Sequence, residues 1–272
     1  MVMDNNKKAI LLTGVSGGIG FEVAKSFINK GYIVFGLDIN DLLEQLEGLH
    51  FIKTDLTKQK EVLSAFEEVK ESGYTLCNIV CTAGVNNLDS LVEISEEEFI
   101  NMFNVNVFSS YRINKTFLPL LEKHGKIIMI SSELAPLDPL PYIGLYGISK
   151  SLVEKYAYAL RMELQLLGYK VVLIRPGAVD TKMIKMSNEQ LNRFVDGTTY
   201  YKTNSQRFKK IVNSVESRKI PPRKVADLIY KVSLKKNPKY VYKINRNPSL
   251  IILSILPKRL QNWIIRQILT AK

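Results

Sequence analysis

Short runs of β-branched and other apolar residues alternate with longer segments of helical periodicity, and this alternation limits the fold more than any other feature. The runs expected to form strands are 9–13, 32–37, 50–53, 76–82, 126–131, 170–175 and 240–243. The helices expected between them are 19–29, 58–71, 96–121 and 145–167. Strand–helix alternation builds a parallel sheet with right-handed crossovers. We therefore predict one α/β domain over residues 1–272, a doubly wound Rossmann-type fold of about seven parallel strands with helices on both faces.

A glycine-rich turn joins the first predicted strand to the first predicted helix, where residues 13–20 read TGVSGGIG. Gly14 permits a tight turn, and Gly18 and Gly20 remove side chains where backbone approaches a pyrophosphate or where helix packs on strand. The helix that follows points its positive end at the phosphates. This context predicts a dinucleotide site. Its expected contacts are Gly14, Ser16, Gly17, Gly18, Ile19 and Gly20.

Asp38 follows the second predicted strand, 18 positions after Gly20. A carboxylate there can accept hydrogen bonds from the adenosine ribose, and it repels a 2′-phosphate. Neither Ile39 nor Asn40 supplies a cation, and the glycine turn holds no Lys or Arg. These residues favour NAD over NADP as the cofactor, whereas an ordinary turn aspartate would leave the choice open.

Tyr146 and Lys150 stand four residues apart on a predicted helix, so their phenol and ammonium groups share one face. The spacing alone says little, because Tyr111 and Lys115 repeat it. Tyr146 is distinguished by its context, since it follows Ser132 across a loop rich in proline and apolar residues. We therefore assign the chemistry to Ser132, Tyr146 and Lys150.

In this order, these residues resemble the classical short-chain dehydrogenase/reductase family over about the first 180 residues. The resemblance implies a catalytic tetrad of Asn106, Ser132, Tyr146 and Lys150, with Ser132 14 residues before Tyr146, slightly farther than is usual. It implies further cofactor contacts from Asp55, Leu56, Ala83, Gly84, Pro176, Gly177, Val179 and Thr181. Cys81-Thr82 replaces the usual Asn-Asn. That departure puts local support of the sheet and the adenosine contacts in doubt.

The expected roles follow from the proton that must accompany a hydride between an alcohol and a ketone. A phenol with a pKa of about 10 is a weak base at neutral pH, so we expect the Lys150 ammonium and an oxidised nicotinamide to lower the pKa of Tyr146. Lys150 would also hold the nicotinamide ribose, and Ser132 would orient the substrate oxygen. Asn106 would position a water that relays protons. Alternatively, Ser132 caps a strand end and Asn106 is a polar residue that bends its helix.

Two segments are expected to enclose the substrate, namely the loop after Ser132 and a lid over residues 182–222, where the strand–helix alternation lapses. The residues assigned to the pocket are Leu134, Tyr142, Met183 and Met186. Apolar walls rich in methionine suit a lipophilic alcohol or ketone, because thioether chains adapt to irregular shapes. The same side chains would serve equally well as ordinary core.

The net charge of +12 is concentrated in the last third of the chain. Residues 1–181 hold 17 Lys/Arg against 22 Asp/Glu, whereas residues 182–272 hold 21 against 4. This basic region either is a solvated lysine-rich surface or meets an anionic one, such as lipid headgroups. Nucleic acid is not expected as a partner, because no recognised binding motif accompanies the charge.

The tail over residues 247–272 adds an amphipathic pattern. One helical face carries Leu260, Trp263, Ile264 and Ile268, flanked by Lys258, Arg259 and Arg266. Such a face can lie in a membrane interface, or it can pack on the protein body or on a sister subunit. Packing on protein is the interpretation that we favour, because soluble doubly wound domains usually cover apolar helix faces with protein.

The predicted function is an NAD(P)-dependent oxidoreductase that interconverts a lipophilic secondary alcohol and its ketone, similar to hydroxysteroid and retinol enzymes of the family. The alternatives are a 3-oxoacyl thioester reductase and a non-catalytic nucleotide-binding scaffold. We expect a homodimer or homotetramer in the cytoplasm, with peripheral contact to an anionic membrane as a further option. No metal is expected, since Cys77 and Cys81 lie within a predicted strand. No apolar run suits a signal peptide or a spanning helix.

Overall fold

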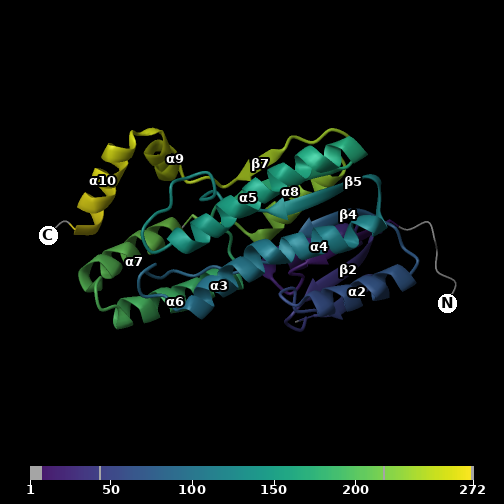
Figure 1. Cartoon of the computed structure of the whole chain (residues 1–272), viewed down its shortest axis with the longest axis horizontal. Helices are drawn as coiled ribbons and strands as arrows, with labels where there is room; N and C mark the ends of the chain where they lie inside the picture. The colour runs from purple at the N-terminus through teal and green to yellow at the C-terminus, as the bar shows by residue number, and fades with distance from the viewer. Residues whose placement is uncertain (1–7, 43, 217, 271–272) are drawn as a thin grey trace.

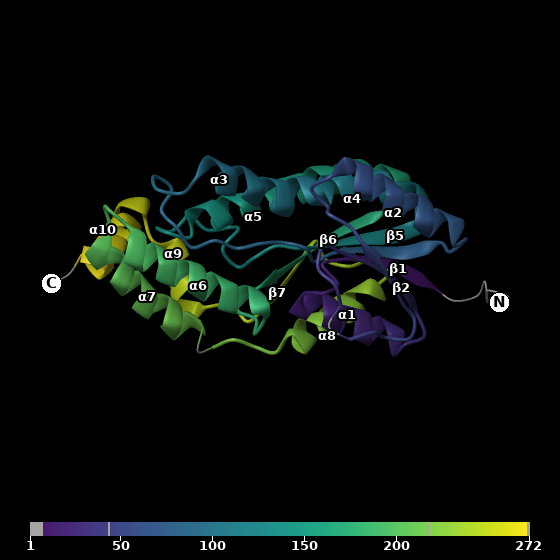
Figure 2. The same ribbon diagram turned by 90° about the horizontal axis from the view of Figure 1, so that it is seen from below.

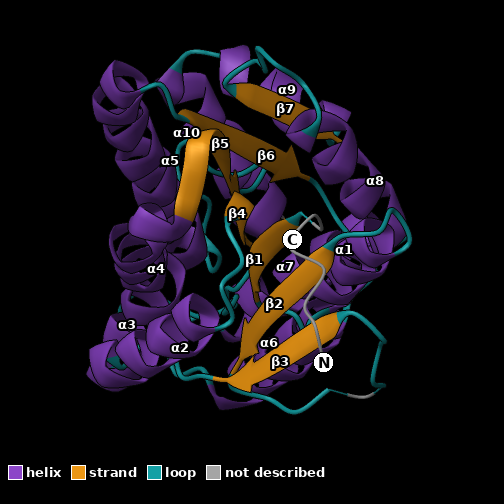
Figure 3. Ribbon diagram, turned by 90° about the vertical axis from the view of Figure 1, so that its right-hand side faces the viewer, coloured by secondary structure: helices purple, strands orange, loops and turns teal. Residues whose placement is uncertain are grey.

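A seven-stranded sheet forms the centre of the protein, whose computed structural model describes residues 8–42, 44–216 and 218–270 (Figure 3). The strands are β1 (Ala9–Thr13), β2 (Ile33–Asp38), β3 (Leu49–Lys53), β4 (Leu76–Cys81), β5 (Leu121–Ile130), β6 (Lys170–Pro176) and β7 (Val241–Ile244). They pair in parallel in the order β3-β2-β1-β4-β5-β6-β7, which confirms the predicted fold class. The strand order reverses between β1 and β4, and such a switch point is where doubly wound sheets bind ligands.

Helices cover both faces of the sheet (Figure 2). One layer contains α1 (Gly18–Ile28) and α8 (Pro222–Ser233), and the other contains α2 (Gln59–Glu71), α4 (Ser109–Phe117) and α5 (Gly144–Leu164). In β1, Ala9 and Leu11 pack toward the α2–α4–α5 layer, whereas Ile10 and Leu12 pack toward the α1–α8 layer. Successive side chains of a strand point to opposite faces, so a strand covered on both sides is apolar throughout.

The helix predicted over 96–121 is interrupted. It consists of α3 (Glu96–Phe103), the π-helical turn η1 (Asn104–Phe108), α4, and the 3-10 turn η2 (Leu118–Leu120). Ser95 caps the start of α3 by accepting a hydrogen bond from the Glu98 N–H. Pro119 lies in η2, where its missing N–H and fixed φ do not favour a continuing α-helix. Leu121 therefore begins β5, five residues before the predicted start at 126.

The lid segment is more regular than its sequence suggested. Residues 182–222 form α6 (Lys182–Gly197) and α7 (Lys202–Glu216), followed by a short connection to α8. The helices α6 and α7 pack together and share a small apolar core that includes Leu88, Tyr142, Phe194 and Phe208. A lapse of strand–helix alternation thus marks two successive amphipathic helices and not an irregular loop.

Two helices end the described chain, α9 (Pro248–Ile255) and α10 (Lys258–Thr270). They lie at the end of the molecule opposite α2, beside α7 (Figures 1 and 2). Within the described residues, no helix is both long enough and apolar enough to cross a membrane.

Candidate active site

The glycine-rich turn between β1 and α1 brings three backbone segments together without side chains between them. Gly14 has a φ of +74°, and a Cβ on it would lie 2.7 Å from the backbone nitrogen of Ala83. A Cβ on Gly20 would collide with the carbonyl oxygen of Gly14. Only glycine fits both positions, because any side chain would push β1, the end of β4 and α1 apart. This is the close packing that the predicted dinucleotide turn requires.

The N-terminus of α1 is open toward the same turn. Gly17 is its N-cap residue and supplies no side-chain cap, so the N–H groups of the first turn can bind an anion. A Cβ on Gly18 would lie 2.9 Å from Cγ2 of Thr181, which brings the turn close to the start of α6. A cavity of about 100 Å³ is lined here by Ser16, Gly17, Gly18, Phe21 and Lys182. The helix terminus and the Lys182 ammonium fit a pyrophosphate, and Thr181 fits the nicotinamide end of the same cofactor.

Asp38 is buried at the carboxyl end of β2, beside the glycine turn. Its carboxylate accepts hydrogen bonds of 2.9 Å from the backbone N–H groups of Ser16 and Asn40. Lys53 pairs with Asp38 in the β2–β3 register, but its ammonium bonds the Asp41 carboxylate at 2.9 Å. The position therefore offers a fixed negative charge, which suits ribose hydroxyls better than a phosphate.

The replacement of the usual Asn-Asn leaves the sheet supported. The Thr82 hydroxyl donates a hydrogen bond of 2.6 Å to the carbonyl oxygen of Thr13, and the Ala83 N–H donates to the Thr13 hydroxyl at 3.4 Å. These bonds join the ends of β1 and β4. Cys77 and Cys81 are buried free thiols in β4, and burial raises the pKa of Cys77 to about 11. In this protein the Thr82 hydroxyl therefore joins β1 to β4, at a position where the family usually has an asparagine amide.

Asp55 lies in the turn between β3 and α2, and hydrogen bonds within that turn fix its side chain. Its carboxylate accepts hydrogen bonds from the Thr57 N–H at 2.9 Å and hydroxyl at 2.6 Å, and it lies 3.3 Å from the Lys58 ammonium. Burial opposes these bonds, which nevertheless lower the pKa of Asp55. Leu56 beside it is buried in the core. The pair borders the cofactor end of β3, and its contact with adenine stays a prediction.

Ser132, Tyr146 and Lys150 meet at the carboxyl edge of the sheet. Tyr146 lies in the first turn of α5, and the Lys150 ammonium lies 5.8 Å from the centroid of its ring. Lys150 is buried and donates a hydrogen bond of 3.2 Å to the carbonyl oxygen of Ile130. Ser132, just beyond β5, hydrogen-bonds the Tyr146 hydroxyl and accepts a bond from the Leu134 N–H at 3.2 Å. The structure thus brings the three predicted residues together.

The competing pair, Tyr111 and Lys115, lies elsewhere. The Lys115 ammonium donates to the Tyr111 hydroxyl at 3.2 Å on the exposed side of α4. Neither residue contacts the serine at the end of β5. Of the two tyrosines, the one chosen by its sequence context, Tyr146, is the one that lies beside Ser132, and its catalytic role stays a prediction.

Asn106 sits in the π-helical turn η1 and is buried. Its amide donates hydrogen bonds to the carbonyl oxygen of Val85 at 2.9 Å and to the Ser149 hydroxyl at 3.0 Å, and its oxygen accepts from the Val85 N–H at 2.8 Å. A Cβ on Gly84 would lie 3.1 Å from the Asn106 oxygen and 3.3 Å from the Lys150 ammonium. Asn106 therefore lies beside Lys150, and π-turns are frequent at functional sites.

The electrostatics of the tyrosine differ from the sequence expectation. Burial raises the pKa of Tyr146 to about 12, a hydrogen bond with Ser132 opposes that rise, and the Glu133 carboxylate adds to it. Burial also lowers the pKa of Lys150 to about 8. Desolvation of the phenol is the largest cause of this shift, and the Lys150 ammonium is not among its causes. The effect of an oxidised nicotinamide on this pKa stays a prediction. At neutral pH the phenol carries its proton.

Two glutamates that sequence reasoning missed hold this edge of the sheet. The Glu154 carboxylate accepts two hydrogen bonds of 2.6 Å from the Arg175 guanidinium and one of 2.6 Å from the Ser131 hydroxyl. Glu133, next to Ser132, accepts a bond of 2.6 Å from the Asn247 N–H. The sequence does contain a signal for the pair Glu154–Arg175, namely a carboxylate in the helix that contains Tyr146 and an arginine near the end of β6. Nothing in the sequence links Glu133 to residue 247.

The residues assigned to the substrate pocket lie in different surroundings. Tyr142 is buried against the rings of Phe194 and Phe208, within the core that α6 and α7 share. Leu134 and Met183 are partly exposed, whereas Met186 is 59% exposed. Their contact with substrate stays a prediction.

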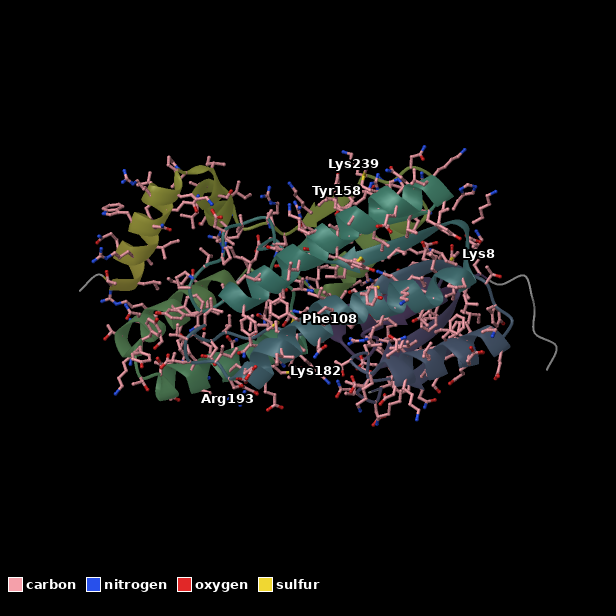
Figure 4. The ribbon with its side chains drawn as sticks, viewed as in Figure 1. Lys8, Phe108, Tyr158, Lys182, Arg193 and Lys239 are labelled. Carbon is pink, nitrogen blue, oxygen red and sulfur yellow. The ribbon has the colours of Figure 1, made fainter. Side chains whose placement is uncertain are left out.

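The lid is tied to the loop after β4. Glu93 accepts hydrogen bonds of 2.7 Å from the Thr198 hydroxyl and the Thr199 N–H, between α6 and α7. A polar cavity of about 250 Å³ is lined there by Asn87, Asp89, Glu93, Glu98, Gln190, Arg193, Phe194, Gly197 and Thr198. Lys182 and Arg193, labelled in Figure 4, lie near opposite ends of α6. The cavity near Arg193 is therefore separate from the smaller one near Lys182, beside the glycine turn.

A doubly wound sheet with a dinucleotide turn, and a Ser–Tyr–Lys group at the carboxyl ends of its strands, defines the class of nicotinamide-dependent α/β oxidoreductases. The family model described as short chain dehydrogenase matches residues 8–192, more than half of the chain. The protein belongs to the short-chain dehydrogenase family. It is an oxidoreductase of the NAD(P)-dependent type, as the resemblance implied.

Several proteins of known structure or function are similar to this chain. The 3-ketodihydrosphingosine reductase of Bacteroides thetaiotaomicron is 28% identical over 257 residues, which cover 94% of this chain and 92% of that protein. The NADPH-dependent 3-dehydrocapnine reductase of Ornithobacterium rhinotracheale is 32% identical over 246 residues, 85% and 86% of the two chains. A short chain dehydrogenase from Burkholderia cenocepacia J2315, solved in complex with NADP, matches with a TM-score of 0.72 at 18% identity, over 99% and 100% of the chains.

Proposed function

We propose that the protein reduces the ketone of a long-chain lipid to a secondary alcohol, using a nicotinamide cofactor. The observation that carries this proposal is the contact of Ser132, Tyr146 and Lys150, with Tyr146 in its protonated form. A bound reduced nicotinamide supplies the hydride for the carbonyl carbon. The Tyr146 hydroxyl donates its proton to the carbonyl oxygen, which the Ser132 hydroxyl holds in place.

The reductive direction is part of this proposal, and the two similar enzymes that are named as reductases support it. Ketone reduction takes a proton from the Tyr146 hydroxyl, whereas alcohol oxidation would use the phenolate as its base. Lys150, with a pKa lowered to about 8, can return a proton toward Tyr146. Asn106 lies beside it and is the predicted next group of the relay.

The lipid substrate is supported by two of the similar proteins. Both of those enzymes are named as reductases of 3-keto compounds, 3-ketodihydrosphingosine in one case and 3-dehydrocapnine in the other. This substrate class takes the place of the steroid-like one that the sequence suggested. The lipophilic character is common to both.

For the cofactor we propose NAD(H) in preference to NADP(H). The Asp38 carboxylate lies at the carboxyl end of β2 beside the glycine turn, and its neighbours Ile39 and Asn40 carry no charge. One of the similar enzymes is NADPH-dependent, so the preference has to rest on the residues of this chain alone. Asp38 is the residue on which it rests.

The proposed function is tested by initial rates of ketone reduction with NADH and with NADPH. The substrates compared are 3-ketodihydrosphingosine (a long-chain 2-amino-3-ketone), a steroid ketone, an acetoacetyl thioester and an aldohexose. We expect kcat/KM to be largest for the long-chain ketone and to fall by about 10²- to 10⁴-fold in Tyr146→Phe. A steroid, thioester or sugar that reacts faster than the long-chain ketone would refute the proposed substrate class.

We also propose a homo-oligomer that pairs through the face carrying α4 and α5. Phe108 and Tyr158, labelled in Figure 4, are among the apolar side chains exposed on this face. A second copy would cover them, because exposed apolar patches of this kind mark interaction sites. The mass in solution tests the idea, and Phe108→Glu should reduce it to that of a single chain.

A further inference from the structure

The helices α9 and α10 expose a group of large apolar side chains, which we call the α9–α10 surface. Its members are Ile252, Ile255, Leu260, Trp263 and Ile268. Ile255 is 77% exposed and Trp263 is 58% exposed. Isolated apolar residues on a surface need no explanation, but a group on two consecutive helices calls for a partner.

The packing of α10 does not use this surface. Its buried residues are Gln261 and Leu269, and Ile265 packs beside them against the core of the lid. The Gln261 amide donates a hydrogen bond of 2.7 Å to the carbonyl oxygen of Leu256, and the Leu269 carbonyl accepts one of 2.8 Å from Asn204 of α7. Of the apolar face predicted from the sequence, Leu260, Trp263 and Ile268 are therefore exposed, whereas Ile264 is partly buried.

The charged residues of the chain segment that carries this surface are all cations. After Asp227 the chain has 45 residues with ten Lys or Arg and no Asp or Glu. Arg259 and Arg266 are exposed on α10 itself, and Lys258, at its start, lies 3.2 Å from the Asp138 carboxylate. A helix with apolar side chains, one tryptophan and flanking cations is the pattern of an interfacial segment.

We propose that the α9–α10 surface binds the headgroup region of an anionic lipid bilayer. The apolar side chains would enter the interface, and the arginines would contact acidic headgroups. A second copy of this chain is a poorer partner for the same surface. A two-fold interface sets a patch against itself, so it would bring the cations of two tails together with no acidic residue in either tail to neutralise them.

The start of α9 lies close to the reactive edge of the sheet. The loop between β7 and α9 is bound to the catalytic loop through the Asn247 N–H and the Glu133 carboxylate, at 2.6 Å. Glu133 is the neighbour of Ser132, so α9 begins next to the place where the ketone is held. If the substrate is the proposed lipid ketone, this arrangement would let it pass from the bilayer to the active site. That consequence rests on the proposed function, whereas the binding of the bilayer itself does not.

Trp263 is the only tryptophan in the chain, which makes its fluorescence a probe of this surface. The full-length protein, without cofactor or substrate, is titrated with vesicles of phosphatidylglycerol and phosphatidylcholine, and with vesicles of phosphatidylcholine alone. We expect the emission to shift to the blue and to be quenched by brominated lipid only in the anionic vesicles. Salt should reverse the shift, because it screens charges beyond about 8 Å at physiological ionic strength.

Variants separate the contributions of charge and apolar area. The double variant Arg259→Glu/Arg266→Glu should weaken partitioning to anionic vesicles by at least about tenfold. Ile255→Ser should weaken it as well, measured by flotation. The matched controls are Lys60→Glu, on exposed α2, and Leu166→Ser, whose side chain is 83% exposed far from the tail. Both controls should bind as the unchanged protein does.

Two results would overturn the proposal. One is an unshifted Trp263 emission with anionic vesicles at low salt. The other is a tryptophan that is already shielded from a soluble quencher without vesicles, together with a mass in solution that Ile255→Ser lowers, which would assign the surface to a second copy. Loss of ketone reduction without loss of vesicle binding would refute the proposed substrate and leave this surface intact.

Discussion

The Glu133 carboxylate accepts a hydrogen bond of 2.6 Å from the Asn247 N–H, and this bond joins the residue after the reactive serine to the loop that leads into α9. The second carboxylate oxygen faces Gly177, where a Cβ would lie 2.9 Å from it. Burial raises the pKa of Glu133, although the bond from Asn247 opposes that rise. The catalytic edge and the C-terminal helices are therefore linked through one partly buried side chain.

Replacing Glu133 tests this link. Glu133→Ala should lower the free energy of unfolding by about 1–3 kcal/mol, because the Asn247 N–H loses its acceptor. Glu133→Gln keeps an acceptor and removes the charge, so most of that loss should be absent. Removing the charge should also lower the pKa of Tyr146, since Glu133 contributes to its rise. Denaturant titrations measure the stability. Equal losses in the two variants would show that the bond does not hold the loop.

Tyr146→Phe should reduce kcat for ketone reduction by about 10²- to 10⁴-fold, the usual contribution of a general acid. Cofactor binding should be nearly unchanged, because the glycine turn and Asp38 remain. Tyr111→Phe is the matched control, since it removes the hydroxyl of the second Tyr–Lys pair on exposed α4. Steady-state rates and cofactor titration give both quantities. A large loss in Tyr111→Phe with an active Tyr146→Phe would contradict the assignment.

The pH profile should report Lys150. Burial lowers the pKa of Lys150 to about 8, and the ammonium form is the one that can return a proton to Tyr146. As pH rises through that value the ammonium is lost, so kcat for reduction should fall with a slope of one proton. The phenol, with a pKa of about 12, should add no fall in the same range. Rapid-mixing rates across the range provide the measurement.

Lys150→Arg is the control for that profile. Arginine stays charged at these pH values, so a variant that retains activity should lose the fall near pH 8. Circular dichroism at each pH checks that the fold is intact. A fall that persists in Lys150→Arg would assign the titration to another group.

The sheet was predictable because buried parallel strands are continuous apolar runs bounded by polar turns. The register of β1 against β2 and β4 then places the glycine turn, Asp38 and Thr82 at one edge of the sheet. Their proximity follows from the order of the parallel strands, without knowledge of any side-chain contact. The tetrad was found by its order along the chain. Its electrostatics were not, because the pKa of Tyr146 depends on how deeply the hydroxyl is desolvated, which no sequence pattern states.

The C-terminal region was harder to predict, for a physical reason. Both sides of α10 carry apolar residues, Ile265 and Leu269 on one and Leu260 and Trp263 on the other. Periodicity cannot choose between two apolar faces, since the choice depends on the partner surface offered by α7. The bond from Asn204 to the Leu269 carbonyl fixes that choice in three dimensions. The irregular lid predicted over residues 182–222 was wrong, because the prediction relied on the alternation of strands and helices, and no strand is predicted within that segment.

Asp38 should decide the cofactor, and the carboxylate has two separable effects. It holds the glycine turn through the Ser16 and Asn40 N–H groups, and it repels a 2′-phosphate by its charge. Asp38→Ala removes both effects. It should therefore reduce the difference in affinity between NADH and NADPH, and it should also weaken the binding of NADH. Asp38→Asn removes the charge and keeps one oxygen acceptor, so it loses only one of the two backbone hydrogen bonds. It therefore perturbs the turn less than Asp38→Ala does.

We expect the unchanged protein to bind NADH more tightly than NADPH. In Asp38→Asn, the affinity for NADPH should rise at least about tenfold relative to the affinity for NADH. A tenfold ratio corresponds to about 1.4 kcal/mol, and the repulsion between two close negative charges at a partly buried site costs more than that. Titration of both cofactors by nicotinamide fluorescence at one ionic strength gives the ratio directly, and Asp41→Asn is the matched control, since its carboxylate already bonds Lys53. Equal or reversed affinity in the unchanged protein would mean that Asp38 turns away from the ribose when the cofactor binds.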